Sequence, residues 1–486
     1  MLVRQSKNTF IRVYDNVGYI TNQLTRYDRS YNETGADFLS KISREPRDIE
    51  SIILELHDLY GESVAFEKLK CDFEKFITDL EKYYFLVTGI SKEECDKKDI
   101  DFSYSLGNMK TKIYDFSQNT GQEIAISTEE YMLALDQKKP QLKSIQFELT
   151  SKCNERCIHC YIPNQKKDTG RDMSYEQVCD IIDQFASIGG LHVTLSGGEV
   201  FLHKDILRII QYCRKKDMEI CILSNLISLK EIQIPFIKSA NVSYIQASLY
   251  SMVPEIHDSI TTIKGSQAKT KSAIEKLVAA DIPVQISCPL MKANKDGYAD
   301  VLKYAQSLQI KAFSDYIMMA GADLSTDNLV HRLSIADTEK VIKDIMDFDP
   351  DYSKWIEKKR PKLEHMTLEE YATQPLCGVG INSCCISENG DVYPCPGWQS
   401  FAVGNINNHS LKEIWEKSDK LKELRLITRK QFPECLNCEA KRYCSMCLER
   451  NFNENNGDMF KINRHFCEVA FLTKKLHEEY RNKGLI

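Results

Sequence analysis

From Lys143 onward, short apolar stretches alternate with amphipathic stretches, and this alternation constrains the fold most. The apolar stretches have the length and composition of buried strands: Ser144–Leu149, His192–Leu195, Glu219–Leu223, Val242–Leu249, Val284–Cys288 and Ala312–Ile317. The stretches between them carry apolar residues at helical spacing, as in Tyr175–Ile188, Lys204–Lys215 and Ala268–Ala279. Strands that alternate with helices form parallel sheets. The pattern therefore predicts an α/β fold, an open partial (β/α)6 barrel.

The first 90 residues follow a different pattern. Phe10–Tyr14 and Gly18–Thr21 predict short strands around a turn at Asp15 and Asn16. Three stretches with helical spacing follow, namely Ala36–Ile42, Ile49–Tyr60 and Leu69–Phe85. Strands followed by three helices predict a small winged-helix-like module. Residues 91–142 are polar and mixed in composition, which is typical of a linker.

The number of cysteines is unusual for a chain of this kind. Eighteen cysteines in 486 residues exceed what a large chain normally uses, while disulfide-rich scaffolds are short and secreted. The polar stretch Met1–Phe10 lacks the features of a secretory signal, so we expect a cytoplasmic protein with reduced thiols. Clustered cysteines in such a protein indicate metal binding. Six cysteines are scattered singly and are expected to act as small buried apolar residues: Cys71, Cys95, Cys179, Cys213, Cys221 and Cys288.

Charge and hydropathy exclude two kinds of partner. The formal net charge is −6, from 64 basic and 70 acidic residues that are mixed along the chain. Without a basic stripe, a nucleic acid partner is not expected. The chain also has no apolar run of the ~18–20 residues that span a bilayer, so no membrane partner is expected.

The first cysteine group follows the first predicted barrel strand. Cys153, Cys157 and Cys160 have the spacing C-x₃-C-x₂-C and lie on a loop at the carboxyl end of that strand. Active sites of parallel sheets and barrels collect at this edge. Three thiolates can hold three irons of a [4Fe–4S] cluster and leave the fourth iron free for a substrate or cofactor. The alternative, a structural zinc site, would need a fourth ligand.

This spacing resembles the signature of the radical S-adenosylmethionine (radical SAM) superfamily, although His159 stands where the family usually has an aromatic residue. Ser196-Gly197-Gly198-Glu199 resembles the family's GGE motif, whose backbone meets the SAM amino group. The resemblance places Ser224 and Asn225 at the SAM ribose and Ser248 at its carboxylate. It thus implies six residues that bind SAM: Gly197, Gly198, Glu199, Ser224, Asn225 and Ser248.

One neighbouring segment departs from the family pattern. His257 and Asp258 resemble the start of an H-D-x-x-R segment, but Thr261 occupies the arginine position. The carboxylate-binding arginine is therefore not identified. The alternative for His257 and Asp258 is a helix-capping pair.

The second cysteine group lies near the C-terminus. Its two C-x₂-C pairs are five residues apart, closer than the ~12–20 residues of most zinc modules. The array resembles the SPASM domain, which carries two auxiliary [4Fe–4S] clusters, although the last gap is two residues where the common pattern has three. The resemblance assigns Cys377, Cys395 and Cys447, with Cys384 or Cys385, to auxiliary cluster I, and Cys435, Cys438, Cys444 and Cys467 to auxiliary cluster II. Strand alternation would turn only one of Cys384 and Cys385 inward. If neither is a ligand, cluster I has an open iron.

The front module resembles the RiPP recognition element, which binds leader peptides of ribosomally made peptides. The resemblance rests on Tyr31-Asn32-Glu33-Thr34-Gly35, followed by Phe38 and Leu39. It implies that a leader peptide adds a strand to the sheet edge and lies against the helix Leu69–Phe85. The alternative is a domain that only packs on the barrel.

Together, these resemblances identify a radical SAM peptide maturase of the sactipeptide, ranthipeptide or streptide type. They imply a recognition element at residues 1–90, a linker at 91–142, a TIM-like partial barrel at 143–325, bridging helices at 326–374 and a SPASM domain at 375–486. The implied cofactors are three [4Fe–4S] clusters and SAM. The implied partners are a precursor peptide and a one-electron donor such as flavodoxin or ferredoxin.

The implied reaction is hydrogen abstraction from the precursor peptide, followed by an oxidative intramolecular crosslink. Among the possible crosslinks, a thioether is expected first, and a carbon–carbon or carbon–oxygen bond second. No catalytic side chain is assigned. The alternatives are a peptide epimerase, an anaerobic sulfatase-maturing-type enzyme, and a metal-containing protein that only binds peptide.

Overall fold

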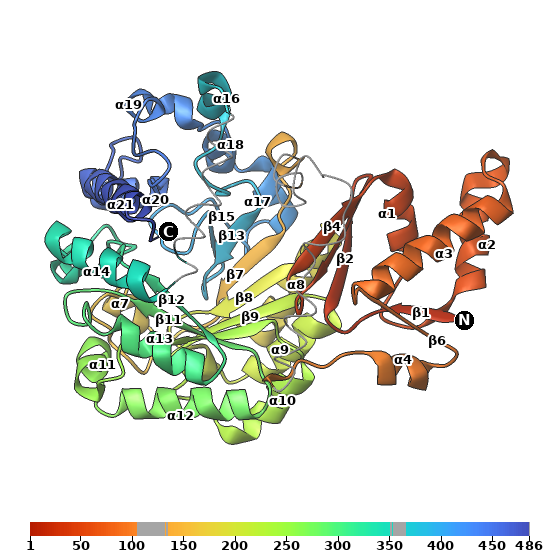
Figure 1. The fold of residues 1–486 in the computed structure, drawn as a ribbon, viewed down its shortest axis with the longest axis horizontal. Helices are drawn as coiled ribbons and strands as arrows, with labels where there is room; N and C mark the ends of the chain where they lie inside the picture. Colours follow the sequence, from red (N-terminus) through yellow and green to blue (C-terminus); the bar gives the residue numbers. More distant parts are fainter. Residues whose placement is uncertain (105–131, 133–134, 350–351, 353–365, 486) are drawn as a thin grey trace.

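The computed structural model describes residues 1–104, 132, 135–349, 352 and 366–485. Within these residues, six parallel strands pair in chain order (Figure 1). They are β7 (Ser144–Glu148), β8 (His192–Ser196), β9 (Glu219–Ser224), β10 (Tyr244–Ser248), β11 (Val284–Pro289) and β12 (Lys311–Asp315). The predicted α/β partial barrel is confirmed, with each strand within a few residues of its predicted position.

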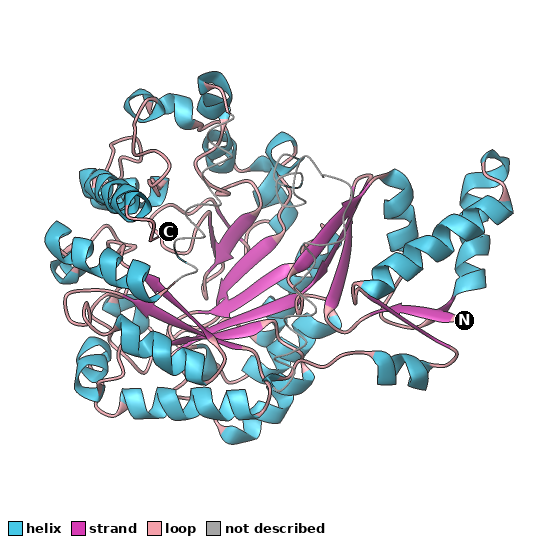
Figure 2. Cartoon of the chain, in the orientation of Figure 1, coloured by secondary structure: helices cyan, strands magenta, loops and turns pink. Residues whose placement is uncertain are grey.

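Helices cover the outer face of this sheet (Figure 2). They include α8 (Tyr175–Ser187), α9 (Ile206–Lys215), α10 (Ile234–Ser239), α11 (Pro254–Thr261), α12 (Ser266–Ala279) and α13 (Tyr298–Ser307). On β7, Ile145 and Phe147 join the apolar core, whereas Gln146 and Glu148 point to the opposite side because strand side chains alternate. The inner side of the barrel at β7 is therefore polar.

The sheet of the barrel continues into the cysteine-rich region. β13 (Ser383–Ile386) pairs in parallel with β7, and β14 (Asp391–Tyr393) and β15 (Gly404–Asn405) extend the sheet beyond it. In the described part of the chain this makes one sheet of nine strands. The register places Cys385 opposite Gln146, so the second cysteine group begins directly beside the first barrel strand.

Short helices complete the C-terminal region. They are α16 (Leu368–Thr373), α17 (Leu411–Lys417), α18 (Asp419–Arg425), α19 (Pro433–Leu436), α20 (Leu448–Glu454) and the longer α21 (Arg464–Asn482). The last of these packs against α14 (Ile335–Phe348), where Ile342 and Met346 contact Leu472 and Leu476. α14 and α16 fall in the predicted bridging segment, most of whose residues between these two helices lie outside the described residues.

The front module contains two small sheets and three α-helices, and a fourth helix follows it in the described residues. One sheet has the order β2 (Thr9–Tyr14), β3 (Val17–Asn22), β4 (Tyr27–Tyr31), and the other has β5 (Arg47–Asp48), β1 (Leu2–Gln5), β6 (Leu86–Gly89). The helices are α1 (Glu33–Ser40), α2 (Ile49–Tyr60), α3 (Phe66–Lys82) and α4 (Lys92–Lys98). The two predicted strands and three predicted helices are present, and α4 lies in the segment read as a linker. Asn32 caps α1, because its side chain accepts a hydrogen bond from the Gly35 backbone (3.2 Å).

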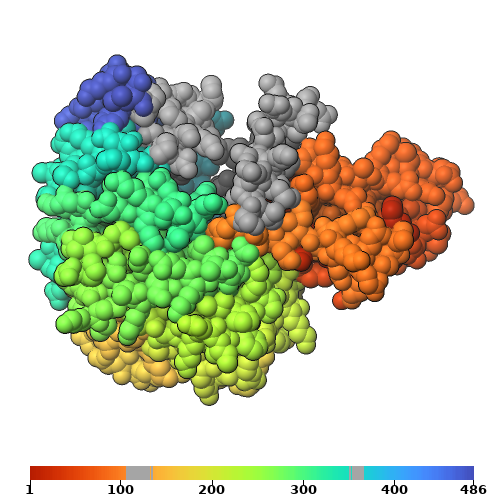
Figure 3. All heavy atoms as spheres, turned by 60° about the horizontal axis from the view of Figure 1, so that its bottom comes forward, coloured from red at the N-terminus to blue at the C-terminus, as the bar shows by residue number. Residues whose placement is uncertain are grey.

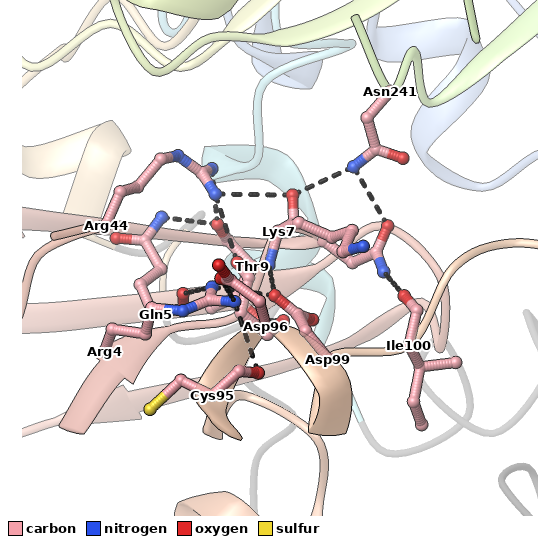
Figure 4. A network of polar contacts seen from close by, with 12 residues as sticks. Arg4, Gln5, Lys7, Thr9, Arg44, Cys95, Asp96, Asp99, Ile100 and Asn241 are labelled. Atoms are coloured by element: carbon pink, nitrogen blue, oxygen red, sulfur yellow. Dashed lines mark hydrogen bonds and ion pairs between the residues drawn. The ribbon is translucent and has the colours of Figure 1, made fainter. Parts of the chain in front are cut away.

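The front module projects from one side of the barrel (Figure 3) and docks on the turns that precede β9 and β10. Asp217 pairs there with Arg12 and Arg44. Asn241 donates to the backbone carbonyl of Lys7 at 2.9 Å (Figure 4). These turns lie at the amino ends of the parallel strands. The module therefore docks at the edge of the sheet opposite to the first cysteine group.

None of the described helices has the length and apolar character that a membrane span requires.

Candidate active site

The first cysteine group lies on the loop that leaves the carboxyl end of β7. Thr150 fixes the start of this loop through a hydrogen bond to Asp172 (2.6 Å), and Lys152 forms an ion pair with the same carboxylate (2.6 Å). Further along, the backbone NH groups of Arg156 and Ile158 donate to the end of α11, at Thr261 and Ile260. The loop is thus held on both sides, which fixes the cysteines between its two anchors.

The structure brings Cys153, Cys157 and Cys160 together. Burial raises the pKa of Cys153 to about 11. Burial and then the neighbouring Glu155 and Cys160 raise the pKa of Cys157 well above its usual value. The buried Lys167 side chain lies beside all three sulfur atoms: burial opposes its charge, but contact with Cys160 and the nearby Cys153 and Cys157 raises its pKa. Three thiols beside one buried cation are a donor set that fits an iron–sulfur cluster, whose thiolates carry negative charge.

Glu155 lies inside the same loop, almost completely buried. Its Oε2 accepts a hydrogen bond from the Cys157 thiol (3.2 Å), and its Oε1 has no hydrogen-bond partner in the described part of the chain. Burial raises the pKa of this carboxyl to about 7. The sequence offered only the position of Glu155 between two cysteines as a signal, and neither Glu155 nor Lys167 was predicted as a site residue.

Gly197 and Gly198 form the tight turn after β8 that packs against the cysteine loop. A Cβ atom on Gly198 would lie 2.2 Å from the carbonyl oxygen of Lys152, and one on Gly197 would lie 2.5 Å from that of Thr150. Gly197 also has φ of +136°, which side-chain-bearing residues rarely adopt. The backbone NH of Gly198 donates to Thr150 at 2.7 Å. Both glycines are therefore required for the close approach of the two loops.

Glu199, Ser224 and Asn225 form one hydrogen-bonded unit. The Glu199 carboxylate accepts from the Ser224 hydroxyl (2.7 Å) and from the Asn225 backbone NH (2.8 Å). Asn225 in turn donates from its side chain to Asn154 in the cysteine loop (2.7 Å). The structure thus brings five of the six predicted SAM residues to the carboxyl ends of β8 and β9, next to the cysteines, and it shows Glu199 as the residue that ties Ser224 and Asn225 together.

The sixth predicted residue, Ser248, ends β10 at the same edge and contacts the Tyr250 hydroxyl. Nearby, the His159 ring packs against Tyr250 (centroids 4.9 Å apart), and Tyr250 packs against His257 (5.2 Å). Asp258 accepts from the Gln267 backbone NH (3.0 Å) and the Ser266 hydroxyl (2.9 Å) at the start of α12. Asp258 therefore caps α12, as the capping alternative expects, whereas His257 accepts from the Tyr250 backbone NH (3.2 Å) and caps no helix in the described residues.

A buried polar network lies between the first cysteine group and the C-terminal region. Glu148, at the end of β7, accepts from the Tyr161 hydroxyl (3.1 Å) and from the Gln399 side chain (2.7 Å). Lys166 donates to Gln399 (2.7 Å) and lies 3.5 Å from both Glu148 and Glu388. Burial raises the pKa values of Glu148 and Tyr161. The sequence did not predict these residues, because they come together only through the fold.

Cys377, Cys395 and Cys447 lie near one carboxylate, that of Glu449. The Cys395 thiol lies 3.3 Å and the Cys447 thiol 4.0 Å from Glu449 Oε2. Burial and then Glu449 raise the pKa values of Cys395 and Cys447, the latter to about 11, and both also raise that of Cys377. The three predicted ligands of auxiliary cluster I are thus brought together, with a residue among them that was not predicted.

The two adjacent cysteines of β13 face opposite sides of the sheet. Cys384 lies opposite Ile145 and belongs to the apolar core, whereas Cys385 lies opposite Gln146 on the side of Glu148. Burial and then Glu148, Cys384 and Cys395 raise the pKa of Cys385. Of the pair, only Cys385 therefore faces the second cysteine group.

The four predicted ligands of auxiliary cluster II also lie close together. Burial and then the neighbouring Cys444, Cys467 and Cys438 raise the pKa of Cys435 to about 11. Cys435 stands on α19 and Cys467 on α21, so the group joins two helices. Among the described residues, no group of three or more His, Cys, Asp or Glu side chains has an arrangement that could hold a single metal ion.

Two family models match the chain in the regions that carry these cysteines. Residues 147–305 match the Radical SAM superfamily, and residues 377–439 match SPASM, an iron–sulfur cluster-binding domain. Residues 147–305 therefore form a radical SAM domain. More closely, the chain combines this domain with a SPASM domain, which follows the barrel as predicted.

Curated relatives resemble about two thirds of the chain. The AdoMet-dependent heme synthase of Methanosarcina barkeri is 26% identical over 63% of this chain and 91% of its own length. The antilisterial bacteriocin subtilosin biosynthesis protein AlbA of Bacillus subtilis is 29% identical over 64% of this chain and 68% of its own length. The PqqA peptide cyclase of Methylocella silvestris is 22% identical over 60% of this chain and 79% of its own length.

Similarity to solved structures extends further along the chain. The structure of Streptococcus suis SuiB bound to precursor peptide SuiA has a TM-score of 0.60 with 13% sequence identity, and it covers 93% of this chain and 97% of SuiB. The structure of anSMEcpe with bound AdoMet and Cp18Cys peptide has a TM-score of 0.51 with 17% identity, over 71% of this chain and 99% of anSMEcpe. At these identities the likeness concerns the fold.

Proposed function

We propose that this radical SAM/SPASM enzyme modifies a ribosomally made precursor peptide, whose leader segment binds to the front module. The observation that carries the proposal is the combination of that module with the two cysteine-rich regions in one chain. The SuiB fold, which has been solved with a precursor peptide, covers 93% of this chain. A peptide substrate therefore accounts for the front module as well as for the barrel.

In the proposed enzyme, Cys153, Cys157 and Cys160 hold a [4Fe–4S] cluster. SAM is bound by the six predicted residues: Gly197, Gly198, Glu199, Ser224, Asn225 and Ser248. Reductive cleavage of SAM at such a cluster supplies a 5′-deoxyadenosyl radical that takes a hydrogen atom from an unactivated carbon. The protein's own residues position and shield this chemistry. Lys167 offsets the negative charge of the three thiolates, and Glu199 fixes Ser224 and Asn225.

The Glu148 network supplies a polar surface between the two cysteine-rich regions. Tyr161 directly follows Cys160, and Gln399 belongs to the loop after Cys395, so Glu148 links the two proposed cluster sites. In the proposed reaction the substrate carbon lies between these sites. The second electron would leave through the auxiliary cluster held by Cys377, Cys395 and Cys447. This arrangement favours an oxidative crosslink, with a thioether before a carbon–carbon or carbon–oxygen bond.

The proposed leader site lies along β4 and α3. In the proposed complex the leader adds a strand beside β4, which pairs with β3 in the described residues. Beside it, Arg29 of β4 pairs with Asp79 of α3, and a shallow cavity of about 640 Å³ follows the exposed side of this helix. The cavity is lined by Cys71, Glu74, Lys75, Thr78, Asp79 and Lys82. Its mixture of acidic and basic side chains suits a polar peptide.

A second candidate function comes from the heme synthases among the relatives. The Methanosarcina barkeri synthase matches over 91% of its own length but over only 63% of this chain. A tetrapyrrole-modifying enzyme would leave the remainder of the chain, and hence a separate peptide-binding module, without a role. The peptide proposal uses the whole chain and is therefore preferred.

The test is incubation of the reconstituted enzyme with SAM, a one-electron reductant such as reduced flavodoxin, and candidate substrates without oxygen. The candidates are short peptides encoded beside this protein, each as the full precursor and as the leaderless core, together with Fe-coproporphyrin III. Modification of a full precursor but not of its core supports the proposal. Conversion of the porphyrin, or equal conversion of core and precursor, contradicts it.

A further inference from the structure

The fourth ligand of auxiliary cluster I is open in the sequence, where Cys384 and Cys385 were the candidates. The structure directs Cys384 into the apolar core and so removes it from this role. Cys385 faces the correct side, beside Glu148. A second residue, however, lies in direct contact with two of the three cysteines that the cluster requires.

Glu449 places its carboxylate among these three cysteines. Oε2 is 3.3 Å from the Cys395 sulfur and 4.0 Å from the Cys447 sulfur. These two cysteines come from distant parts of the chain, so the carboxylate lies at the point where the loop after β14 meets the start of α20. The side chain is fully enclosed, with 3% of the residue exposed.

The surroundings of Glu449 keep space for this carboxylate. Gly397 borders Oε1, and a Cβ atom at this position would lie only 2.0 Å from that oxygen. The Gly397 carbonyl is itself held by the Asn453 side chain of α20 at 2.9 Å, so the glycine cannot simply move away. A side chain at position 397 would therefore displace the Glu449 carboxylate, and glycine avoids this clash.

The Oε1 atom has no hydrogen-bond partner in the part of the chain that the structure describes. Burying a carboxylate oxygen without a partner is unfavourable, and buried charges in proteins are paired or coordinate metal ions. Carboxylates are established iron ligands alongside thiolates and imidazoles. An iron atom held by Cys377, Cys395 and Cys447 would supply what Glu449 lacks.

We propose that Glu449 is the fourth protein ligand of auxiliary cluster I, which gives this cluster three thiolates and one carboxylate. The inference rests on the proposed auxiliary clusters. It leaves Cys385 as a free thiol beside Glu148, on the side that faces the proposed substrate. A carboxylate exchanges more readily than a thiolate, so this iron is also the position at which a substrate thiol would bind.

The test uses the full chain with Cys153, Cys157 and Cys160 replaced by Ala, so that only the auxiliary clusters remain. After anaerobic reconstitution, iron and sulfide are counted, and the oxidised protein is examined by electron paramagnetic resonance. We expect about eight irons per chain and no [3Fe–4S] signal in this background. Glu449→Ala should lose about one iron per chain on oxidation and show a [3Fe–4S] signal, because an iron without a protein ligand dissociates first.

Three further variants in the same background make the result specific. Gly397→Ala keeps the carboxylate but displaces it, and should produce the same signal. Cys385→Ser and the exposed-residue control Glu423→Ala should behave as the background does. A [3Fe–4S] signal from Cys385→Ser, with none from Glu449→Ala, would overturn the assignment in favour of Cys385. A signal from the background itself would show an open iron and overturn it as well. A background protein that binds no iron would reject the auxiliary clusters themselves, together with the ligand.

Discussion

Gln399 donates a 2.7 Å hydrogen bond to Glu148 and thereby joins the SPASM region to the first strand of the barrel. Both side chains lie in the polar network between the two proposed cluster sites, and Glu148 is 1% exposed. The contact couples two domains that the sequence presents as separate. Its strength therefore bears on how firmly the two sites are held relative to one another.

Replacing Gln399 by Leu should destabilise the protein by about 2 kcal/mol, because a buried carboxylate loses one of its hydrogen-bond donors. For domains of this size such a loss lowers the thermal midpoint by about 4–8 °C. Circular dichroism of the anaerobically prepared protein measures the shift. Gln306→Leu, at an exposed position of α13, is the matched control and should shift the midpoint little. Equal shifts for both variants would contradict the role of the contact.

Acid should weaken the base of the barrel, where the front module docks. Glu219 is buried, which opposes its charge, but hydrogen bonds from His192 (2.7 Å) and Ser243 (2.7 Å) and the nearby Arg26 lower its pKa to about 2. A lowered folded-state pKa stabilises the protein above the unfolded-state pKa of about 4.3. This contribution is lost as the pH falls from about 5 toward 2.

The comparison is between the wild type and Glu219→Gln in urea unfolding at several pH values. The wild type should be more stable at pH 7, by up to about 3 kcal/mol, and this advantage should shrink between about pH 5 and pH 3. An exposed carboxylate, Glu231, provides the control through Glu231→Gln, because it lies outside the docking region. A difference between wild type and Glu219→Gln that does not change with pH would rule out titration of Glu219 as the cause.

Replacing Cys153, Cys157 and Cys160 by Ala should abolish formation of 5′-deoxyadenosine from SAM. These three thiols lie on the loop that leaves the carboxyl end of β7, and a SAM-cleaving cluster needs all three. Chromatography of the products after reduction measures the effect. Cys71→Ala, at an exposed site of the front module, should retain full cleavage. Cleavage by the triple variant would disprove the assignment of the primary cluster.

Local patterns were sufficient to predict the barrel. The six strands are apolar runs of strand length, and the cysteine spacings lie within single loops, so both are visible in short stretches of sequence. The pairing of β13 with β7 was not predictable in the same way, because Cys385 and Gln146 meet only through the folded chain. Alternation correctly required Cys384 and Cys385 to face opposite sides of the sheet. Only the pairing of β13 with β7 shows that Cys384 faces the apolar core and that Cys385 faces Glu148.

Three of the contacts that were missed share one property. Glu449 reaches Cys395 across 54 positions of sequence, Gln399 reaches Glu148 across 251, and Arg44 reaches Asp217 across 173. Each is an ordinary charged or amide residue in its local context. Its role arises from burial beside a distant partner, and no spacing rule describes that.

Filling the cavity along α3 should weaken binding of the precursor. Thr78 is exposed in the middle of this cavity, and Thr78→Trp would occupy the space beside the β4 edge. We expect the Kd of the full precursor to rise at least about tenfold, which corresponds to about 1.4 kcal/mol. Fluorescence anisotropy with a labelled precursor measures it.

The control for this variant is Asp58→Trp, which adds the same side chain to an exposed position of α2 away from the cavity. Its affinity should equal that of the wild type. SAM cleavage without peptide should also be unchanged in both variants, because the cysteine loop lies at the opposite edge of the barrel. Unchanged precursor binding by Thr78→Trp would place the leader elsewhere.

The product should be a precursor peptide with one or more intramolecular crosslinks. The deoxyadenosyl radical removes one hydrogen atom from a substrate carbon. When a thiol or another side chain joins that carbon, a second electron and a proton must leave, the electron to an auxiliary cluster and the proton to a base or solvent. Each event therefore removes two hydrogens in total. In the proposed enzyme, the auxiliary cluster held by Cys377, Cys395 and Cys447 would accept that second electron.

Mass spectrometry of the reacted precursor distinguishes this outcome from epimerisation. A crosslink lowers the mass by about 2 Da per event, whereas inversion of a residue leaves the mass unchanged in ordinary water and adds about 1 Da in heavy water. Epimerisation also requires a thiol that returns a hydrogen atom, and the free Cys385 beside Glu148 would then be the first residue to replace. Fragmentation that locates the loss of two hydrogens between a cysteine and a second residue supports a thioether. A product of unchanged mass with incorporated deuterium would refute the crosslink and assign the enzyme to the epimerases.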